Sequence, residues 1–529
     1  MMKSFLITAA IFFGICLIYI LMMLPATGNY FTYILDDAYI HLAVAKNFAL
    51  HGVWGVTPYA FSSSSSSPVF TFIISILISV FGNHALIPLI FNIVVCGLLI
   101  AVLVRYYSYF LDQNKHIVTA CLFTLFLPVL HVQVMSGMEH VLQTFVIAVN
   151  IYSFQRWAQD DFKMGLYAYW FYFTILLLGL IRFESMFYFV SLSLVFFLTR
   201  NFKNALWVLI CGFVPIMIFG YFNYHRSGYF FPNSVVVKGT LIDFSGNVLA
   251  QVTHIILKKL LFNITFYKIG LFPLLIGGVF MYKDYKGKLS FRSAISGNFL
   301  FIAFGLTLMM HCLFGEIRSI FRYEAYLLVA FSMVLIPKLL SYFRKPWSAF
   351  KMNPVTGMFI IANVLLLVYK CNYSHALILN GSANIYQQQI QSARFLNRYY
   401  NTSKVVANDI GAITYFTEIH LLDFVGLGSM ELVDFKIRKK GFDDEVEEFL
   451  TDYTRAHNYQ LAIAYEEWLD GHPPKNWKKV AALEVKSDNA VLGFKRLFIY
   501  SIDPETRDAL VQNVKAFDWD DNVTVTMIQ

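Results

Sequence analysis

The chain has 529 residues, of which 58% are hydrophobic and 18% aromatic, while only 14% are charged. A soluble domain has about 25% charged residues, so this composition excludes a large soluble enzyme and disorder over most of the chain. Residues 1–371 carry 25 Lys/Arg and 11 Asp/Glu, whereas residues 372–529 carry 16 and 22. We therefore expect a polytopic α-helical membrane body over 1–371 and one soluble domain over 372–529. Nothing in this charge balance indicates a nucleic-acid partner.

Apolar runs long enough to cross a bilayer predict about 11 transmembrane helices. The runs lie near 5–24, 85–104, 116–135, 139–155, 164–181, 184–199, 205–222, 265–282, 297–314, 323–343 and 355–370. A further run, 69–81, has only 13 residues and suits an interfacial helix. With that choice and the N-terminus inside, every short inside loop is basic, as the positive-inside rule requires. The first loop (residues 25–84) and the C-terminal domain are then extracytoplasmic.

The first outer loop contains an aspartate pair, Asp36 and Asp37. Either acid is a good N-cap for a short helix that ends before Gly52, and we expect this helix to lie along the membrane surface. Asp37 and His41 are four residues apart and share a helix face. Capping explains one acid of the pair, so the second suggests a general base beside an orienting or metal-binding partner.

A serine run at residues 62–67 follows within the same loop. Low complexity of this kind favours a flexible linker. The alternative is that the run shapes the entrance of a site, because it joins two helices of one outer loop.

Further ionisable side chains fall at span ends that the topology places on the outer face. Such groups are costly at the edge of a bundle, so they usually pair, line an aqueous cavity or do chemistry. Arg182 and Glu184 flank a span junction, where mutual pairing is as good an interpretation as ligand contact. Glu139 begins the fourth span, either as a helix N-terminal acid or as a contact to an acceptor or a divalent ion. The remaining outer-face cations of interest are Lys238, Arg318 and Arg322.

Beyond residue 371 the sequence alternates short strands with helices, which predicts an α/β domain. The expected strands are 404–407, 420–425, 460–464, 480–485 and 492–500; the expected helices are 384–400 and 410–417. Asp409 is suited to cap the second helix. No GxGxxG, P-loop or GxSxG segment occurs, so we interpret the domain as a lid or acceptor-guiding module over the outer face.

Several segments together resemble the GT-C class of membrane glycosyltransferases, and most closely the family that includes the mycobacterial terminal arabinofuranosyltransferase. They occur in the family's order, over residues of roughly 30–430. The segments are Asp36-Asp37-Ala38-Tyr39-Ile40, Ser136-Gly137-Met138-Glu139, Arg182-Phe183-Glu184-Ser185, Pro232-Asn233-Ser234 with Lys238, Arg322-Tyr323, Asn408-Asp409-Ile410-Gly411 and Asp423-Phe424-Val425-Gly426-Leu427. This chain departs from the family in having Phe183 in place of a proline and a degenerate serine run at the end of the first loop.

The resemblance implies a sugar donor on a polyprenyl phosphate and inverting transfer on the outer face of a bacterial cytoplasmic membrane. The acceptor would be an envelope glycan, lipid or protein. Such a reaction needs a base for the acceptor hydroxyl and cations for the departing phosphate. The resemblance favours Asp36 as the base, with Asp37 as the alternative. The donor-phosphate candidates are Lys238, Arg318, Arg322 and Arg182; the acceptor-side candidates are Glu139, Glu184, His41 and Tyr39.

Two questions stay open at this level. No dense ligand cluster demands a metal, yet a divalent cation remains compatible with the acids. The alternative function is a polytopic transporter or lipid-linked-glycan flippase. It is less favoured, because internal repeats and midplane helix breaks are missing from the sequence and the acids gather at one face.

Overall fold

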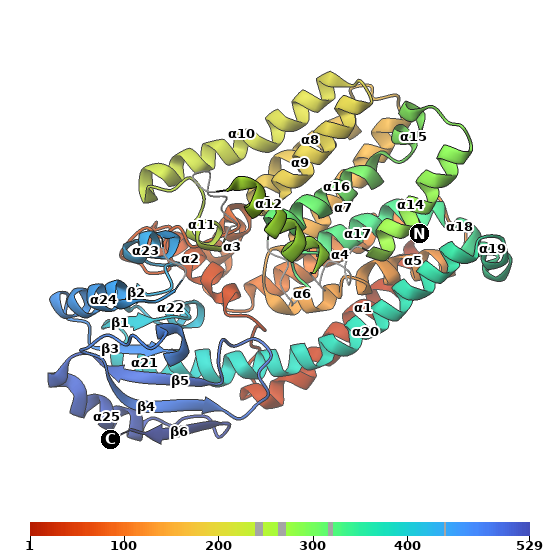
Figure 1. Ribbon diagram of the computed structural model, residues 1–529. Helices are drawn as coiled ribbons and strands as arrows, with labels where there is room; N and C mark the ends of the chain where they lie inside the picture. Colours follow the sequence, from red (N-terminus) through yellow and green to blue (C-terminus); the bar gives the residue numbers. More distant parts are fainter. Residues whose placement is uncertain (239–246, 263–270, 316–320, 439–440, 529) are drawn as a thin grey trace.

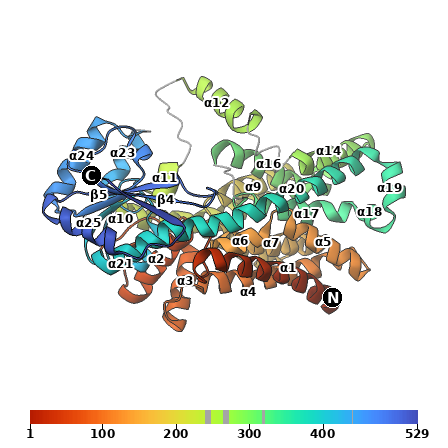
Figure 2. The same ribbon diagram turned by 90° about the horizontal axis from the view of Figure 1, so that it is seen from below.

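The computed structural model describes the whole chain except residues 239–246, 263–270, 316–320, 439–440 and 529 (Figure 1). It consists of a helical bundle with an α/β domain at one end. Both views place the N-terminus at the end of the bundle that faces away from this domain (Figure 2).

The predicted apolar runs fall on helices or on consecutive helices, the described part of the 265–282 run included. These helices are α1 (Met2–Met23), α4 (Ile87–Tyr107), α5 (Asn114–Phe126) with α6 (Leu130–Ser136), α7 (His140–Gln159), α8 (Leu166–Ile181), α9 (Ser185–Leu198), α10 (Phe202–Ser227), α14 (Leu271–Lys286), α16 (Phe299–Phe314), α17 (Ala325–Leu335) and α20 (Pro354–Ile385). Short helices link them: α11 (Asn233–Lys238), α12 (Val248–Ile256), α15 (Phe291–Gly297), α18 (Leu340–Arg344) and α19 (Pro346–Met352).

Of the helices that the structure describes, four are long and apolar enough to cross a membrane, or six if each of two bent pairs counts as one span. Several others, such as α8 and α9, are apolar but shorter. The chain is thus a multi-pass membrane protein, whereas the count of eleven crossings stays a prediction.

Two of the basic loops predicted to lie inside, near 283–292 and 344–351, are at the end of the bundle away from the α/β domain (Figure 1). At the end away from the α/β domain, Arg344 pairs with Asp112 at 3.3 Å and Lys283 donates to Asn353 at 2.8 Å. Of the ionisable residues predicted for the outer face, five described ones meet at the other end, beside the α/β domain: Asp37, Glu139, Arg182, Glu184 and Arg322. Which end faces the cytoplasm stays a prediction.

The first outer loop forms two helices, α2 (Asp37–His51) and α3 (Pro68–Phe81). Helix α2 ends at Gly52, whose φ of 68° suits glycine, as predicted. Residues 38–47 of α2 are all buried, because α3 covers one side and the C-terminal domain another. The expectation that α2 lies along the membrane surface is therefore wrong: the C-terminal domain, not lipid, covers its apolar face.

Helix α20 does not stop at the predicted domain boundary. It continues through a π-helical turn (Tyr386–Ile390) into α21 (Gln391–Tyr400), so one helical segment runs from Pro354 to Tyr400. The boundary predicted at 371/372 thus lies inside a continuous helix that joins the bundle to the α/β domain (Figure 1). The change in composition marks where this helix leaves the apolar part of the bundle.

The C-terminal domain is built on a six-stranded sheet of order β2-β1-β3-β5-β4-β6. Its strands are β1 (Lys404–Ala407), β2 (His420–Asp423), β3 (Leu461–Ala464), β4 (Lys478–Val485), β5 (Arg496–Ser501) and β6 (Val523–Met527). Strands β2, β1 and β3 are parallel, whereas β5, β4 and β6 are antiparallel to their neighbours. The helices are α22 (Gly411–Phe416), α23 (Val433–Arg438), α24 (Asp444–Ala456) and α25 (Arg507–Ala516). The sequence predicts the first five strands and α22 but misses β6 and the helices α23, α24 and α25.

Candidate active site

A cavity of about 390 Å³ lies at the end of the bundle next to the C-terminal domain. Its wall is assembled from segments far apart in the sequence: the first outer loop, later segments around Met138, 182–187, 231–236, 314–315 and 322–323, and Leu427 of the C-terminal domain. The ionisable side chains that line it are Asp37, His41, Arg182, Glu184 and Arg322. Five of the predicted site residues therefore share one cavity.

Arg322 and Asp37 form an ion pair across this cavity, with Nη1 and Oδ2 2.6 Å apart. The Arg322 side chain is 11% exposed and that of Asp37 is 32% exposed, so both can be reached by a ligand. A purely structural role for Arg322 would pair it with Glu316 or Glu324. Glu316 lies outside the described residues, and no ion pair between Arg322 and Glu324 occurs among the described contacts. Glu324 is instead buried at the start of α17.

Arg182 is held between two carboxylates. Its guanidinium lies 2.5 Å from Glu139 and 2.5 Å from Glu184. Arg182 closes α8 in an extended conformation, and Glu184 stands at the N-cap position of α9. The pairing of Arg182 with Glu184 is thus present, and the same two side chains also line the cavity.

Tyr323 joins the two arginines. Its ring centroid lies 5.2 Å from Cζ of Arg182 and 4.9 Å from Cζ of Arg322. Cations over an aromatic face are attracted by its quadrupole. The ring therefore contacts both guanidinium groups, each of which also pairs with a carboxylate.

His41 connects the first loop to Glu139. Its Nε2 lies 3.4 Å from Glu139, and its Nδ1 lies 2.9 Å from the Thr71 hydroxyl. Burial lowers the pKa of His41 below its ordinary value, although Glu139 opposes the shift. The neutral ring can accept at Nδ1 from the Thr71 hydroxyl, which leaves the Nε2–H on the side of Glu139, a tautomer that we assign from these contacts.

Asp36 points away from the cavity, although it precedes Asp37. Its two carboxylate oxygens accept hydrogen bonds from the backbone N–H groups of Gly411 (2.7 Å) and Ala412 (2.8 Å) at the start of α22. Asp36 stands at the N-cap position of α2 but makes no side-chain cap hydrogen bond there. The prediction that Asp409 caps the helix after it is wrong: Asp36 takes that place, while Asp409 accepts from Gln389 and Tyr465.

The remaining predicted residues are placed as follows. Tyr39 is buried against Tyr415 and Phe416 and does not line the cavity. Lys238 is the last residue of α11, two positions beyond the lining residue Val236. Arg318 lies outside the described residues.

The serine run is buried and bonded, not a flexible linker. Ser63 donates to Asn223 at 2.5 Å, and Ser64 donates to the carbonyl oxygen of Leu427 at 2.9 Å. Ser64 and Ser66 line the cavity. The alternative interpretation, in which this run shapes a site, fits the structure.

Sequence reasoning missed the contribution of the C-terminal domain to the cavity. Asn233 and Ser64 both donate to the carbonyl oxygen of Leu427, and Leu427 lines the cavity. The turn that carries Leu427 is held by Asp423, which accepts from the N–H groups of Leu427 and Gly428. The only signal in the sequence was the resemblance of residues 423–427 to a conserved family segment.

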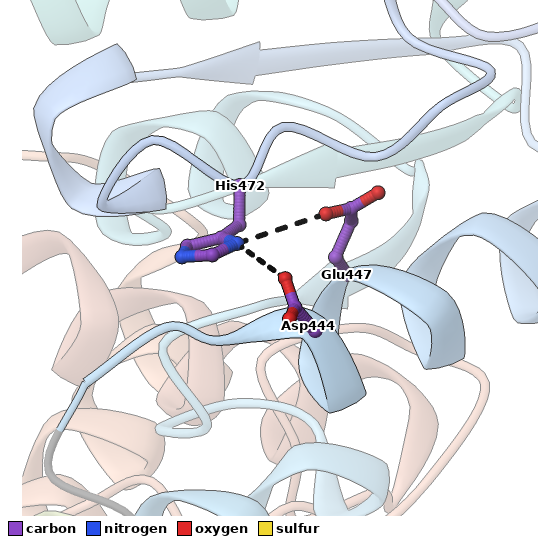
Figure 3. A group of neighbouring side chains, drawn as sticks. All are labelled: Asp444, Glu447 and His472. Carbon is purple, nitrogen blue, oxygen red and sulfur yellow. Dashed lines mark ion pairs between the residues drawn. The ribbon is translucent and has the colours of Figure 1, made fainter.

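One group of three potential metal ligands occurs among the residues that the structure describes: Asp444, Glu447 and His472 (Figure 3). Nδ1 of His472 lies 2.7 Å from Asp444 and 3.8 Å from Glu447. Both acids belong to the first turn of α24, where carboxylates complement the helix dipole, and Lys475 lies 3.9 Å from Glu447. Ordinary ion pairing at the surface accounts for this group, which lies in the C-terminal domain and does not line the cavity.

Comparisons with known proteins agree with this architecture. Residues 383–500 match a protein family described as a domain of unknown function (DUF8728). No curated protein matches the chain in sequence. The crystal structure of ArnT from Cupriavidus metallidurans bound to undecaprenyl phosphate is similar, with a TM-score of 0.54 and 12% identity over 94% of this chain and 98% of ArnT.

An oligosaccharyltransferase from Archaeoglobus fulgidus, in the apo form, has a TM-score of 0.49 and 12% identity over 98% of this chain and 76% of that chain. AglB from Archaeoglobus fulgidus, in complex with an inhibitory peptide and a dolichol-phosphate, has a TM-score of 0.48 at 12% identity. The likeness to ArnT, with a TM-score above 0.5, shows that this chain shares the fold of that membrane protein. Membership of the GT-C class and kinship with the arabinofuranosyltransferase family stay predictions.

Proposed function

We propose that this chain is a membrane glycosyltransferase that takes a sugar from a polyprenyl-phosphate donor and transfers it, with inversion, to an acceptor in the cavity beside the C-terminal domain. The carrying observation is that a carboxylate, Asp37, and a guanidinium, Arg322, open to one cavity of about 390 Å³. Fold alone gives no function. A base and a cation beside each other are what the reaction requires.

Asp37 is the better candidate for the base. Both oxygens of Asp36 are engaged by backbone N–H groups of α22, and Asp36 does not line the cavity. Asp37 lines the cavity on the same helix face as His41. In the transfer step the acceptor hydroxyl gives its proton to Asp37, its oxygen bonds to the anomeric carbon, and the bond from that carbon to the phosphate oxygen breaks.

Arg322 is the better candidate for the leaving phosphate. Arg182 already faces two carboxylates, Glu139 and Glu184, so its charge is more than balanced. Arg322 faces Asp37 at 2.6 Å and can exchange this partner for a donor phosphate, because a guanidinium binds carboxylate and phosphate with the same fork. When Arg322 binds the phosphate in this way, the Asp37 carboxylate becomes available to accept the proton of the acceptor hydroxyl.

Further positive charge for an anionic donor would come from Lys238 and Arg318. Lys238 follows the lining residue Val236 by two positions, and Arg318 follows the lining residue Gly315 by three. The donor sugar, pentose or hexose, and the acceptor, an envelope glycan, lipid or protein on the outer face, are parts of the proposal that rest on the resemblance of the segments quoted above.

The test is transfer by the purified full-length enzyme in nanodiscs, supplied with undecaprenyl-phosphate pentoses and hexoses and with lipid and glycan extracts. Release of undecaprenyl phosphate and a matching mass increase in an acceptor are expected. Asp37→Asn should lower the rate at least about 100-fold. The matched control is Asp112→Asn, which removes another Asp–Arg pair at the opposite end of the bundle. Equal rates in wild type and Asp37→Asn would refute the assignment, and movement of an intact donor across the bilayer would indicate a flippase.

A further inference from the structure

Helix α22 of the C-terminal domain is a short helix whose N-terminal amides are satisfied from outside the domain. The first N–H groups of any helix lack partners within it. In α22 the N-cap residue, Ile410, offers no side-chain bond. Asp36 instead accepts from both Gly411 and Ala412, 375 and 376 residues away in the chain.

The other end of α22 is held by the same helix of the first loop. Lys46 donates from Nζ to the carbonyl oxygens of Tyr415 (3.0 Å), Thr414 (3.4 Å) and Thr417 (3.4 Å) and pairs with Glu418 at 3.0 Å. The Lys46 side chain is only 5% exposed. The Asp36 carboxylate at the N-terminus of α22 and the Lys46 ammonium at its C-terminus complement the helix dipole at both ends.

Contact between α2 and α22 is close. A Cβ atom at Gly411 would lie 2.1 Å from the backbone oxygen of Asp36, so no larger residue fits there without a shift. Beside this contact, Ile40 and Val44 form a buried apolar cluster with Ile410. The register of α2 on the C-terminal domain is therefore fixed by packing as well as by charge.

From this geometry we infer that the C-terminal domain positions the Asp37 carboxylate. Asp36 and Lys46 bind α2 to the two ends of α22, and these contacts set the orientation of Asp37, which directly follows Asp36. Asp36 and Lys46 are then positioning residues, and the domain of unknown function completes the site. The domain also supplies Leu427 to the cavity wall. The inference rests on the proposed function, since it assigns Asp37 as the group that is positioned.

The experiment uses full-length Lys46→Gln and Gly411→Ala, with Lys486→Gln as the matched control. Lys486 is an exposed lysine of the same domain that also donates to a backbone carbonyl, that of Asp521. Both interface variants should lower kcat about 10- to 100-fold, the range expected when a reacting group is displaced by up to about 1 Å. Binding of undecaprenyl phosphate alone and the acid limb of the pH–rate profile should be unchanged. Lys486→Gln should behave as wild type.

Hydrogen exchange reports on the docking itself. Amides 411–416 should exchange about 10-fold faster in Lys46→Gln than in wild type and the control. The double variant Asp36→Asn/Gly411→Ala should have a kcat only slightly lower than that of either single variant, because both substitutions break the same contact between Asp36 and Gly411. Full kcat in Gly411→Ala, unchanged exchange in Lys46→Gln, or loss of the acid limb in Asp36→Asn would overturn the inference. A wild-type enzyme that transfers no sugar would refute the proposed function alone, since the exchange result still decides whether α2 holds the domain.

Discussion

Replacing Arg322 by alanine isolates the charge that we assign to the leaving phosphate. The Arg322 side chain is 11% exposed and faces Asp37 across the cavity at 2.6 Å. A hydrogen bond to a charged group contributes about 1.5–3 kcal/mol. At about 1.4 kcal/mol per tenfold, Arg322→Ala should lower kcat/KM roughly 10- to 150-fold.

The Arg322→Lys variant tests whether the phosphate needs only a positive charge at this position or the bidentate contact of a guanidinium. Arg322→Lys keeps the charge but not the planar bidentate geometry, nor the same stacking over Tyr323. We therefore expect it to recover little of the lost rate. Arg344→Ala is the matched control, because Arg344 pairs with Asp112 at the other end of the bundle and is 56% exposed.

The assay is turnover with a polyprenyl-phosphate sugar, measured beside the melting temperature of each variant. A purely structural Arg322–Asp37 pair would lower the melting temperature of Arg322→Ala and leave the rate per folded molecule unchanged. That result would refute the phosphate role. A rate loss that Arg322→Lys restores fully would refute the bidentate contact but not the charge.

The remaining predictions concern the aromatic spacer and the topology. Tyr323→Leu removes the ring between two guanidinium groups and should weaken undecaprenyl phosphate binding several-fold, at about 0.5–2 kcal/mol per cation–π contact; unchanged binding by calorimetry would argue against the spacer. A reporter that is active only in the cytoplasm should be silent when fused after Gln529 and active when inserted after Lys286. The opposite pattern would invert the topology and the side of the reaction.

Local patterns in the sequence were sufficient for most helices of the bundle and for most strands of the C-terminal domain, but not for its helices α23, α24 and α25. Apolar runs predict the helices of the bundle, and short apolar runs between turns predict five of the six strands, because period and length are local properties. The stop at Gly52 and the shared face of Asp37 and His41 follow from helix geometry in the same way. Strand β6 was missed although its residues alternate between apolar and polar, because it has only five residues and its pairing with β4 is long-range.

The division of labour between Asp36 and Asp37 could not be predicted in this way. Both acids suit the N-terminus of α2, and sequence likeness favoured the first. What separates them is the approach of Gly411, which lies 375 residues later in the chain. The serine run was similarly ambiguous, since its partners Asn223 and Leu427 come from a bundle helix and from the C-terminal domain. Roles of this kind depend on tertiary contacts that a single sequence does not display.

The carboxylates at the domain contact predict how stability changes with pH. Burial, and next the nearby Asp409, raise the pKa of Asp36 to about 7; burial likewise raises the pKa of Asp409 to about 6. The folded state therefore keeps protons that the unfolded chain has already lost, so stability should fall as pH rises from about 4 to 7. Each such group contributes a slope of at most about 1.4 kcal/mol per pH unit. Asp409→Asn removes one of these groups and also removes its contribution to the raised pKa of Asp36. The melting temperature of this variant should therefore fall less steeply between pH 5 and 8 than that of wild type. Asp452→Asn, at an exposed acid of the same domain, should keep the wild-type slope, and equal slopes in all three proteins would show that these carboxylates do not carry raised pKa values.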